Sequence, residues 1–214
     1  MPIRVLVADD HRIVRQGLRT FLGLDPELEV VGEATNGAEA VRMAHESLPD
    51  VVLMDVAMPI LDGVAATGTI RNELPDTEVA VLVGTTDDPD VAAAIEAGAI
   101  GFVAKDSPAE DLRGAVKDAA AGRVQLTPPI AARLLRELGT LLQRSEPLTG
   151  RDVELLRRLA GGHSNAEMAR DLGITERSVG TLVKALLAKL GVSGRAMAVL
   201  CAMHAGLIAA DQMR

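Results

Sequence analysis

An apolar run that ends on a single carboxylate constrains the fold of this chain more than any other feature. The residues from Val51 to Met54 lead directly into Asp55, and a turn containing Met58-Pro59 and Asp62-Gly63 follows. Strands buried in parallel sheets are rich in Val, Ile and Leu, so this run is typical of such a strand. Ligands of open parallel α/β sheets bind at the edge where the strands end. Asp55 is therefore expected at a ligand-binding edge.

A second strand-like run ends in the same way. Residues 3–8 read Ile-Arg-Val-Leu-Val-Ala and are followed by Asp9-Asp10. If the two strands are parallel neighbours, the carboxylates of Asp9, Asp10 and Asp55 converge on one crevice. Clustered anions raise one another's pKa unless a cation shares the site. Mg²⁺ prefers oxygen ligands of this kind, so the sequence predicts a magnesium site formed by these residues.

The composition excludes several classes of protein. The chain has 214 residues, 48% of them hydrophobic and 24% charged, which is typical of a globular protein. No apolar run approaches the length of a membrane span, so we expect a cytoplasmic protein without a membrane partner. The single cysteine, Cys201, excludes a disulfide framework. With two Phe and no Trp or Tyr, the chain lacks the aromatic platforms of single-strand binders.

Charge is distributed unevenly along the chain. Residues 1–122 carry 9 Lys or Arg and 22 Asp or Glu, a net charge of −13. Residues 123–147 have a net charge of +2 and residues 148–214 of +3, which brings the whole chain to −8. An acidic half joined to a weakly basic half indicates two domains with different partners.

The first 122 residues alternate strand and helix patterns. Strands are predicted near residues 3–8, 28–33, 50–55, 78–84 and 100–104, and helices near residues 11–23, 37–47, 62–74, 88–97 and 108–121. This alternation favours a (βα)5 doubly wound parallel sheet of the flavodoxin-like kind. A linker with a helix over residues 130–143 is predicted within residues 123–147.

From residue 148 the strand patterns disappear. Thr149 and Thr175 are predicted to cap helices, and Ser164 to Glu167 has the pattern of a capping box. A short helix ending at Leu172-Gly173 and a longer one ending at Gly191 then form a helix-turn-helix arrangement. The expected second domain, residues 148–214, is small and all-α.

Lys105 adds a cation to the predicted acidic site. It follows Gly101-Phe102-Val103-Ala104, so it stands at the end of the fifth strand. A carboxylate can attack phosphorus when a metal and a lysine neutralise charge on the transferred oxygens. Each residue alone reads as an ordinary strand-end residue. Together they favour a site in which Asp9 and Asp10 hold Mg²⁺, Asp55 attacks, and Lys105 steadies a phosphoryl oxygen.

These residues resemble the receiver domain of two-component response regulators. The matching features are Asp9-Asp10, Asp55 with Met58-Pro59 and Asp62-Gly63, Thr85-Thr86, and Phe102 three residues before Lys105. The second half resembles the LuxR-type helix-turn-helix. It matches at Leu148-Thr149, Glu154, Gly162, Ser164 to Ala169, Leu172 to Thr175, and Leu190 to Val192. The combination is similar to the NarL/FixJ class of transcriptional regulators.

The resemblance implies a switch rather than an enzyme. A sensor histidine kinase would pass phosphate to Asp55, the Thr85 hydroxyl would turn toward the new oxygens, and Phe102 would follow. For Phe102 a plain core position is the alternative. A phosphoryl group brings charge and acceptors that can bias a two-state element. On activation the protein would form a homodimer, and this homodimer would bind double-stranded DNA.

The chain departs from the family pattern at three places, one of which is Gly150 in place of the usual proline at the start of the first helix of the second domain. The stretch between Thr85 and Gly98 is slightly shorter than usual, which affects the face that normally carries the signal. In the recognition helix the family usually has Val-Lys-x-His-Val, whereas residues 179–183 read Val-Gly-Thr-Leu-Val. Glycine costs roughly 1 kcal/mol of helix stability relative to alanine. The residues left as DNA-contact candidates are Thr175, Arg177, Thr181, Lys184, Lys189 and Arg195.

Two other functions are compatible with these features. In the first, the receiver controls a helical domain that binds a protein partner, since Gly180 and Leu182 replace DNA-reading side chains. In the second, the chain is an aspartyl-phosphate phosphatase. Such enzymes usually carry a second aspartate two residues after the nucleophile, and this chain has Ala57 there.

Overall fold

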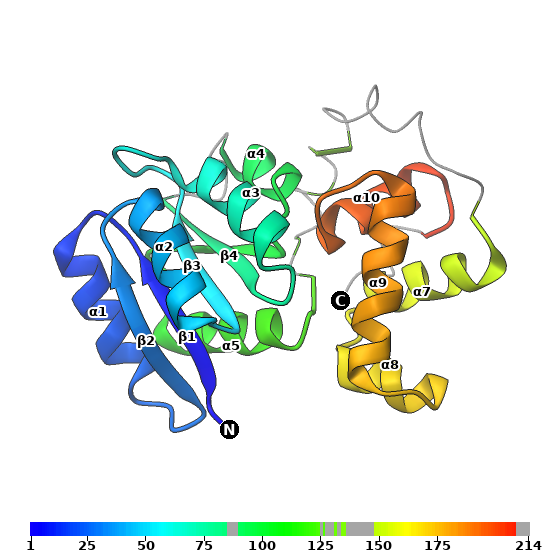
Figure 1. Ribbon diagram of the computed structural model, residues 1–214, viewed down its shortest axis with the longest axis horizontal. Coiled ribbons are helices and arrows are strands. Elements are labelled where there is room, and N and C mark those ends of the chain that lie inside the picture. The colour runs from blue at the N-terminus through cyan, green and yellow to red at the C-terminus, as the bar shows by residue number, and fades with distance from the viewer. Residues whose placement is uncertain (85–89, 125, 127–130, 132–133, 136–147, 209–214) are drawn as a thin grey trace.

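The computed structural model describes residues 1–84, 90–124, 126, 131, 134–135 and 148–208 (Figure 1). It consists of an α/β domain at the N-terminus and a helical domain at the C-terminus. The α/β domain has a central sheet with helices on both faces, and the helical domain lies beside it (Figure 1). The predicted fold class, a doubly wound sheet joined to a small all-α domain, is confirmed.

The sheet has five parallel strands in the order β2-β1-β3-β4-β5. Their bounds are β1 Ile3–Ala8, β2 Leu28–Ala34, β3 Val51–Asp55, β4 Glu78–Val83 and β5 Gly101–Ala104. Every residue of β3 and β4 is buried, because helices cover both faces of the sheet. The two central strands therefore read as continuous apolar runs rather than as alternating patterns.

Five helices cover the sheet in two layers. They are α1 Arg12–Leu22, α2 Gly37–Ser47, α3 Gly63–Glu73, α4 Asp90–Glu96 and α5 Ala109–Ala120. The helices α1 and α5 pack together on one face, and α2, α3 and α4 form a row on the other. Side chains cap two of them: Asn36 accepts from the Glu39 amide, and Asp62 accepts from the Ala65 amide.

The helical domain contains α7 Gly150–Ala160, α8 Asn165–Leu172, α9 Glu176–Leu190 and α10 Arg195–His204. The predicted caps are present, since Thr149 and Ser164 head reciprocal capping boxes and Thr175 accepts from the Ser178 amide. Gly173 takes a left-handed conformation, with φ of 65°, at the turn between α8 and α9. This turn joins the two helices of the helix-turn-helix.

Some predicted elements and residues lie outside the described residues. The linker helix predicted over residues 130–143 lies largely outside the described residues. Two residues of this segment that are described, Ala131 and Leu134, are buried. The helix predicted over residues 88–97 is described from Asp90 onward, and Thr85 and Thr86 lie outside the described residues. Among the described residues, no single helix is long and apolar enough to cross a membrane, although α9 and α10 pass that test as a bent pair.

Candidate functional site

The sheet brings the predicted acidic residues to one edge. In the parallel register of β1 and β3, Ala8 pairs with Met54, so the next residues, Asp9 and Asp55, stand at the same level. Lys105 follows β5, and its amide donates to the Val83 carbonyl at 2.8 Å. All three side chains therefore start from the carboxyl ends of strands, at the edge where α/β sheets bind ligands.

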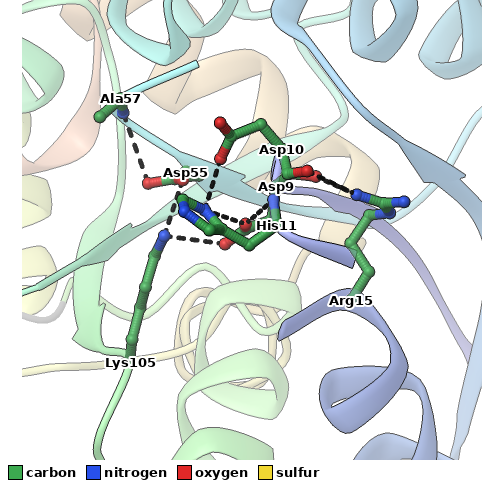
Figure 2. Close-up of polar contacts among 7 residues, drawn as sticks. All are labelled: Asp9, Asp10, His11, Arg15, Asp55, Ala57 and Lys105. Atoms are coloured by element: carbon green, nitrogen blue, oxygen red, sulfur yellow. Dashed lines mark hydrogen bonds and ion pairs between the residues drawn. The ribbon is translucent and has the colours of Figure 1, made fainter. Parts of the chain in front are cut away.

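Lys105 joins the two buried carboxylates (Figure 2). Its Nζ lies 2.7 Å from Asp55 Oδ2 and 2.8 Å from Asp9 Oδ2. The Asp9 and Asp55 side chains are 0% and 3% exposed, whereas the Lys105 side chain is 24% exposed. Two nearly buried anions thus share one cation that still reaches solvent.

The burial of these groups changes their protonation equilibria. Burial raises the pKa of Asp55, and repulsion from Asp9 adds to this effect, while the hydrogen bond from Lys105 opposes it. For Lys105, burial disfavours the ammonium form, yet the hydrogen bonds to Asp55 and Asp9 outweigh it and raise the pKa. The lysine therefore stays charged, and Asp55 is more basic than an ordinary aspartate.

Asp10 and His11 complete the edge of the site. The His11 amide donates to Asp9 Oδ1 at 2.8 Å, and its ring Nδ1 lies 2.6 Å from Asp10 Oδ1. Sequence reasoning did not include His11 among the site residues, because no metal-ligand spacing involves it. Its position directly after Asp9-Asp10 was the available signal.

The site has the donors that a divalent cation needs. Ligand atoms from Asp9, Asp10, His11 and Asp55 all lie within 4.8 Å of one another. Three carboxylates and one lysine leave an excess of negative charge. A divalent cation that prefers oxygen ligands would balance this charge. The carboxylates of Asp9, Asp10 and Asp55 could therefore hold a metal ion.

A tight turn after β3 holds Asp55 in place. The Gly63 amide donates to the Val56 carbonyl at 3.0 Å, which folds the start of α3 back onto the end of β3. A Cβ at Gly63 would lie 1.9 Å from the Asp55 carbonyl oxygen, so only glycine fits there. Within the same turn Ile60 adopts a φ of 72° and is 86% exposed.

The two predicted switch residues have different outcomes. Phe102 is partly buried in β5 and lines a cleft between the two domains together with His163. Thr85 lies outside the described residues. The predicted exchange between them therefore stays a prediction.

The DNA-contact candidates lie far from the acidic site in sequence, in the helical domain. Thr175, Arg177, Thr181 and Lys184 are exposed. The Lys184 Nζ pairs with Asp76 Oδ1 of the α/β domain at 2.7 Å. Lys189 is also engaged, because its Nζ pairs with Asp152 Oδ2 of α7 at 2.7 Å and its side chain is only 22% exposed. Arg195 is buried rather than available to DNA, because its side chain is 6% exposed and its Nε lies 3.4 Å from Glu78 Oε1 of β4.

The two departures in the recognition helix have different surroundings. Leu182 is partly buried and packs against the hydrophobic core of the helical domain beside Leu155 and Leu172. Gly180 borders a small cleft toward the α/β domain. A Cβ there would have no heavy atom of the described residues within 4 Å, apart from its chain neighbours and the adjacent backbone of its own helix. The leucine therefore has a packing role, while the glycine leaves space.

Two known families match this chain, one in each of its domains. Residues 5–117 match the response regulator receiver domain, and residues 146–202 match the bacterial regulatory proteins of the luxR family. The chain belongs to the NarL/FixJ-class response regulators. It combines a receiver with a LuxR-type DNA-binding domain, as transcriptional regulators of this class do.

Full-length relatives of this response regulator have the same organisation. The transcriptional regulatory protein LiaR of Bacillus subtilis (strain 168) is 41% identical over 209 residues, 96% of this chain and 99% of LiaR. The response regulator VraR of Staphylococcus aureus is 37% identical over 208 residues, 97% of this chain and 100% of VraR. The crystal structure of the response regulator ChrA of a heme-sensing two-component system matches with a TM-score of 0.54. ChrA is 35% identical over 97% of this chain and 99% of its own.

Proposed function

We propose that Asp55 is the phospho-acceptor of this response regulator and that a sensor histidine kinase supplies the phosphoryl group. The observation that carries the proposal is the convergence of Asp9, Asp55 and Lys105 from the ends of three strands. Lys105 holds Asp55 Oδ2, and among the described residues the contact to Oδ1 is a 3.4 Å hydrogen bond from the Ala57 amide. We therefore assign Oδ1, the oxygen that Lys105 does not hold, as the attacking atom.

The transfer step conserves atoms and charge. Asp55 Oδ1 attacks the phosphorus of a phosphohistidine, a P–O bond forms, and the P–N bond breaks with its electron pair leaving on the imidazole. The Lys105 ammonium then lies beside the phosphoryl oxygens and stabilises their charge. The raised pKa of Asp55 is consistent with a more basic attacking oxygen.

We infer that the resident metal is Mg²⁺, held by Asp9, Asp10 and Asp55. Bound there, it would neutralise charge on the transferred oxygens. The oxygen-only carboxylate set and the buried Asp9, 0% exposed, support this assignment. Thr85 and Phe102 are proposed to carry the signal onward, on the strength of the family resemblance.

The output is proposed to be binding to double-stranded DNA by the helix-turn-helix, as a homodimer in the cytoplasm and without catalytic turnover or a membrane partner. Residues 1–122 would form the receiver, 123–147 the linker and 148–214 the DNA-binding domain. Four exposed residues support contact with DNA: Thr175, Arg177, Thr181 and Lys184. The α9 N-terminus adds backbone amides of the kind that can hold a phosphate. Lys189 stays a weaker candidate because Asp152 already holds it.

Phosphorylation is tested with a small phosphodonor, which avoids the need for the kinase. The protein is incubated with acetyl phosphate and Mg²⁺, and its intact mass is measured. One phosphoryl group is expected on the wild type and on Asp111→Asn, an exposed aspartate of α5. Asp55→Asn should gain none. Equal labelling of Asp55→Asn would overturn the assignment.

DNA binding is tested on fragmented genomic DNA at about 0.1 M salt, where phosphate contacts still contribute strongly. Beryllofluoride with Mg²⁺ serves as the mimic of phosphorylated Asp55. Binding that tightens with the mimic supports both the switch and the output. Absence of binding with the mimic bound to the receiver would contradict the DNA-binding proposal.

A further inference from the structure

The recognition helix α9 has one buried face and one exposed face. The buried residues pack into the core of the helical domain, and they are Val179, Val183, Leu186, Leu187 and Leu190. Residues that repeat every three or four positions share one side of a helix. Six exposed residues of α9 lie together in this way: Arg177, Ser178, Thr181, Lys184, Ala185 and Ala188. We call them the outer stripe. Base contacts by α9 depend on this stripe, because the opposite face is buried.

The outer stripe contains few groups that can read a base by hydrogen bonding. Asn and Gln read adenine through two hydrogen bonds, and Arg or Lys reads guanine. The sequence of α9, which is described throughout, contains no Asn, Gln or His. The cations of the stripe are Arg177 and Lys184, and Lys184 Nζ pairs with Asp76 Oδ1 at 2.7 Å. Readout by hydrogen bonds from this helix is therefore confined to these two side chains.

The hydroxyl groups of the stripe are engaged within the helix. Thr181 Oγ1 donates to the Arg177 carbonyl at 3.1 Å. Ser178 Oγ lies 2.9 Å from Thr175 Oγ1, which also accepts from the Ser178 amide. The single hydroxyl hydrogen of Thr181 is thus committed to the backbone. What Thr181 retains for a ligand is its γ-methyl group and the lone pairs of its oxygen.

Three side chains of the stripe offer methyl groups. Ala185 and Ala188 follow Thr181 by four and seven positions, so the methyl groups of the three residues line up along one side of α9. We call Thr181, Ala185 and Ala188 the methyl row. All three residues are exposed, so the row is accessible to a ligand. Their short side chains allow a base edge to approach the helix closely.

A methyl group is also what distinguishes one base in the major groove. Thymine carries a C5-methyl group on its major-groove edge, and the side chains that contact it include Ala and the methyl group of Thr. Such a contact removes apolar surface of both partners from water and requires no hydrogen-bond donor. It therefore suits a helix that has few donors to offer.

We propose that α9 selects its DNA sites by apolar contact between the methyl row and thymine methyl groups, while Arg177 and Lys184 contact phosphates. Thr181 is the principal reader, because it lies between these two cations along the stripe. The inference rests on the proposed binding to double-stranded DNA. It adds which base the helix prefers and which atoms make the choice.

The thymine methyl group can be removed alone, because uracil has the same hydrogen-bonding groups as thymine. Full-length protein with beryllofluoride and Mg²⁺ first selects a duplex from fragmented genomic DNA. The duplex is then synthesised with uracil in place of one thymine at a time, and each Kd is measured by fluorescence anisotropy. At a contacted thymine, uracil should weaken binding about fourfold, the factor expected for one methyl-sized apolar group left unburied.

Thr181→Ser removes the matching methyl group from the protein. The serine keeps the hydroxyl that bonds to the Arg177 carbonyl, so α9 should stay intact. This variant should lose the preference for thymine over uracil at the position that Thr181 contacts. Thr20→Ser is the matched control, because Thr20 is exposed on α1 and its Oγ1 donates to the Gln16 carbonyl at 2.8 Å. It removes the same group from the receiver and should keep the full preference.

The outcomes separate this inference from the proposed function. Equal affinity of the wild type for the thymine duplex and every uracil duplex would overturn the methyl readout and leave DNA binding in place. A thymine preference that Thr181→Ser retains in full would overturn the assignment of Thr181 as the reader. Failure to select any duplex with the mimic bound would overturn the proposed output and this inference with it.

Discussion

Asp55 owes its position to its neighbours in the backbone as much as to Lys105. The end of β3 is covered by the start of α3, where Gly63 approaches so closely that a Cβ would lie 1.9 Å from the Asp55 carbonyl oxygen. The same helix begins with Asp62, which accepts from the Ala65 amide at 2.7 Å. The Asp62-Gly63 pair thus caps a helix and clears space for the backbone of Asp55, the proposed phospho-acceptor.

Gly63→Ala should destabilise the receiver by about 3 kcal/mol, near the upper end of the cost of overpacking. It should also slow phosphorylation, because the backbone of Asp55 must shift. Urea unfolding and labelling by acetyl phosphate measure the two effects. Gly114→Ala is the control. Gly114 lies in α5, and a Cβ there would have no heavy atom of the described residues within 4 Å apart from its chain neighbours and the adjacent backbone of α5. Alanine at this position should therefore stabilise the receiver by about 0.5–1 kcal/mol. Equal stability of the two variants would contradict this account.

Among the helices, α8 shows how capping and charge act together. In its capping box the amide of Ser164 donates to Glu167 Oε2 at 2.7 Å, and the hydroxyl donates to the same oxygen at 2.8 Å. The hydrogen bond from the Ser164 backbone amide lowers the pKa of Glu167 most, and the bond from the Ser164 hydroxyl lowers it further. Arg123 adds to the effect, and the pKa of Glu167 is about 2. The half of the capping box that Glu167 accepts is therefore strongest while Glu167 is ionised, whereas the bond from its backbone amide to Ser164 Oγ does not depend on that charge.

The sign of the resulting pH dependence follows from linkage. The pKa of Glu167 falls from an ordinary 4.5 to about 2 on folding, so its contribution to stability is present above pH 4.5. It is lost as the pH falls from 4.5 toward about 2. Glu167→Gln should flatten this part of the stability profile, measured by urea unfolding across that pH range. Glu176→Gln, an exposed glutamate in the first turn of α9, should leave it unchanged.

The recognition helix α9 contains an avoidable cost in Gly180. A Cβ there would meet open space, so alanine removes the entropic penalty of glycine without a clash. Gly180→Ala should stabilise the helical domain by about 1 kcal/mol. Gly173→Ala should instead destabilise it, because Gly173 has a φ of 65°. Thermal unfolding of the two variants in parallel checks both directions.

At the scale of the whole molecule, charge is segregated. The receiver is strongly acidic, the DNA-binding half has a net charge of only +3, and Lys184 and Lys189 are both paired with aspartates. Such a protein has few cations available for phosphates. Its affinity for DNA is then expected to rest on a small number of contacts.

The salt dependence of DNA binding should accordingly be shallow. Each lost phosphate contact reduces the slope of log K against log salt by about one, so Arg177→Gln should lower it by that amount per protomer. Arg42→Gln, on α2 of the receiver and paired with Glu46, should leave the slope unchanged. Anisotropy titrations at several salt concentrations measure it. A steep slope that is insensitive to Arg177 would contradict this description.

The sequence by itself determined what depends on neighbours along the chain. Buried runs ending at Asp9, Asp55 and Lys105 predicted the sheet edge and the acidic site, because parallel strands bring their carboxyl ends together. The caps at Ser164 and Thr175 were readable because capping bonds span only three residues.

Only the tertiary structure decided what depends on contacts between distant segments. The pairing of Lys184 with Asp76, 108 residues apart, and of Arg195 with Glu78 leaves no local pattern in the chain. The same holds for Leu182, whose packing against the core explains its place in the recognition helix. These contacts arise from how two independently patterned domains fit together, and no periodicity or motif within either domain encodes that fit.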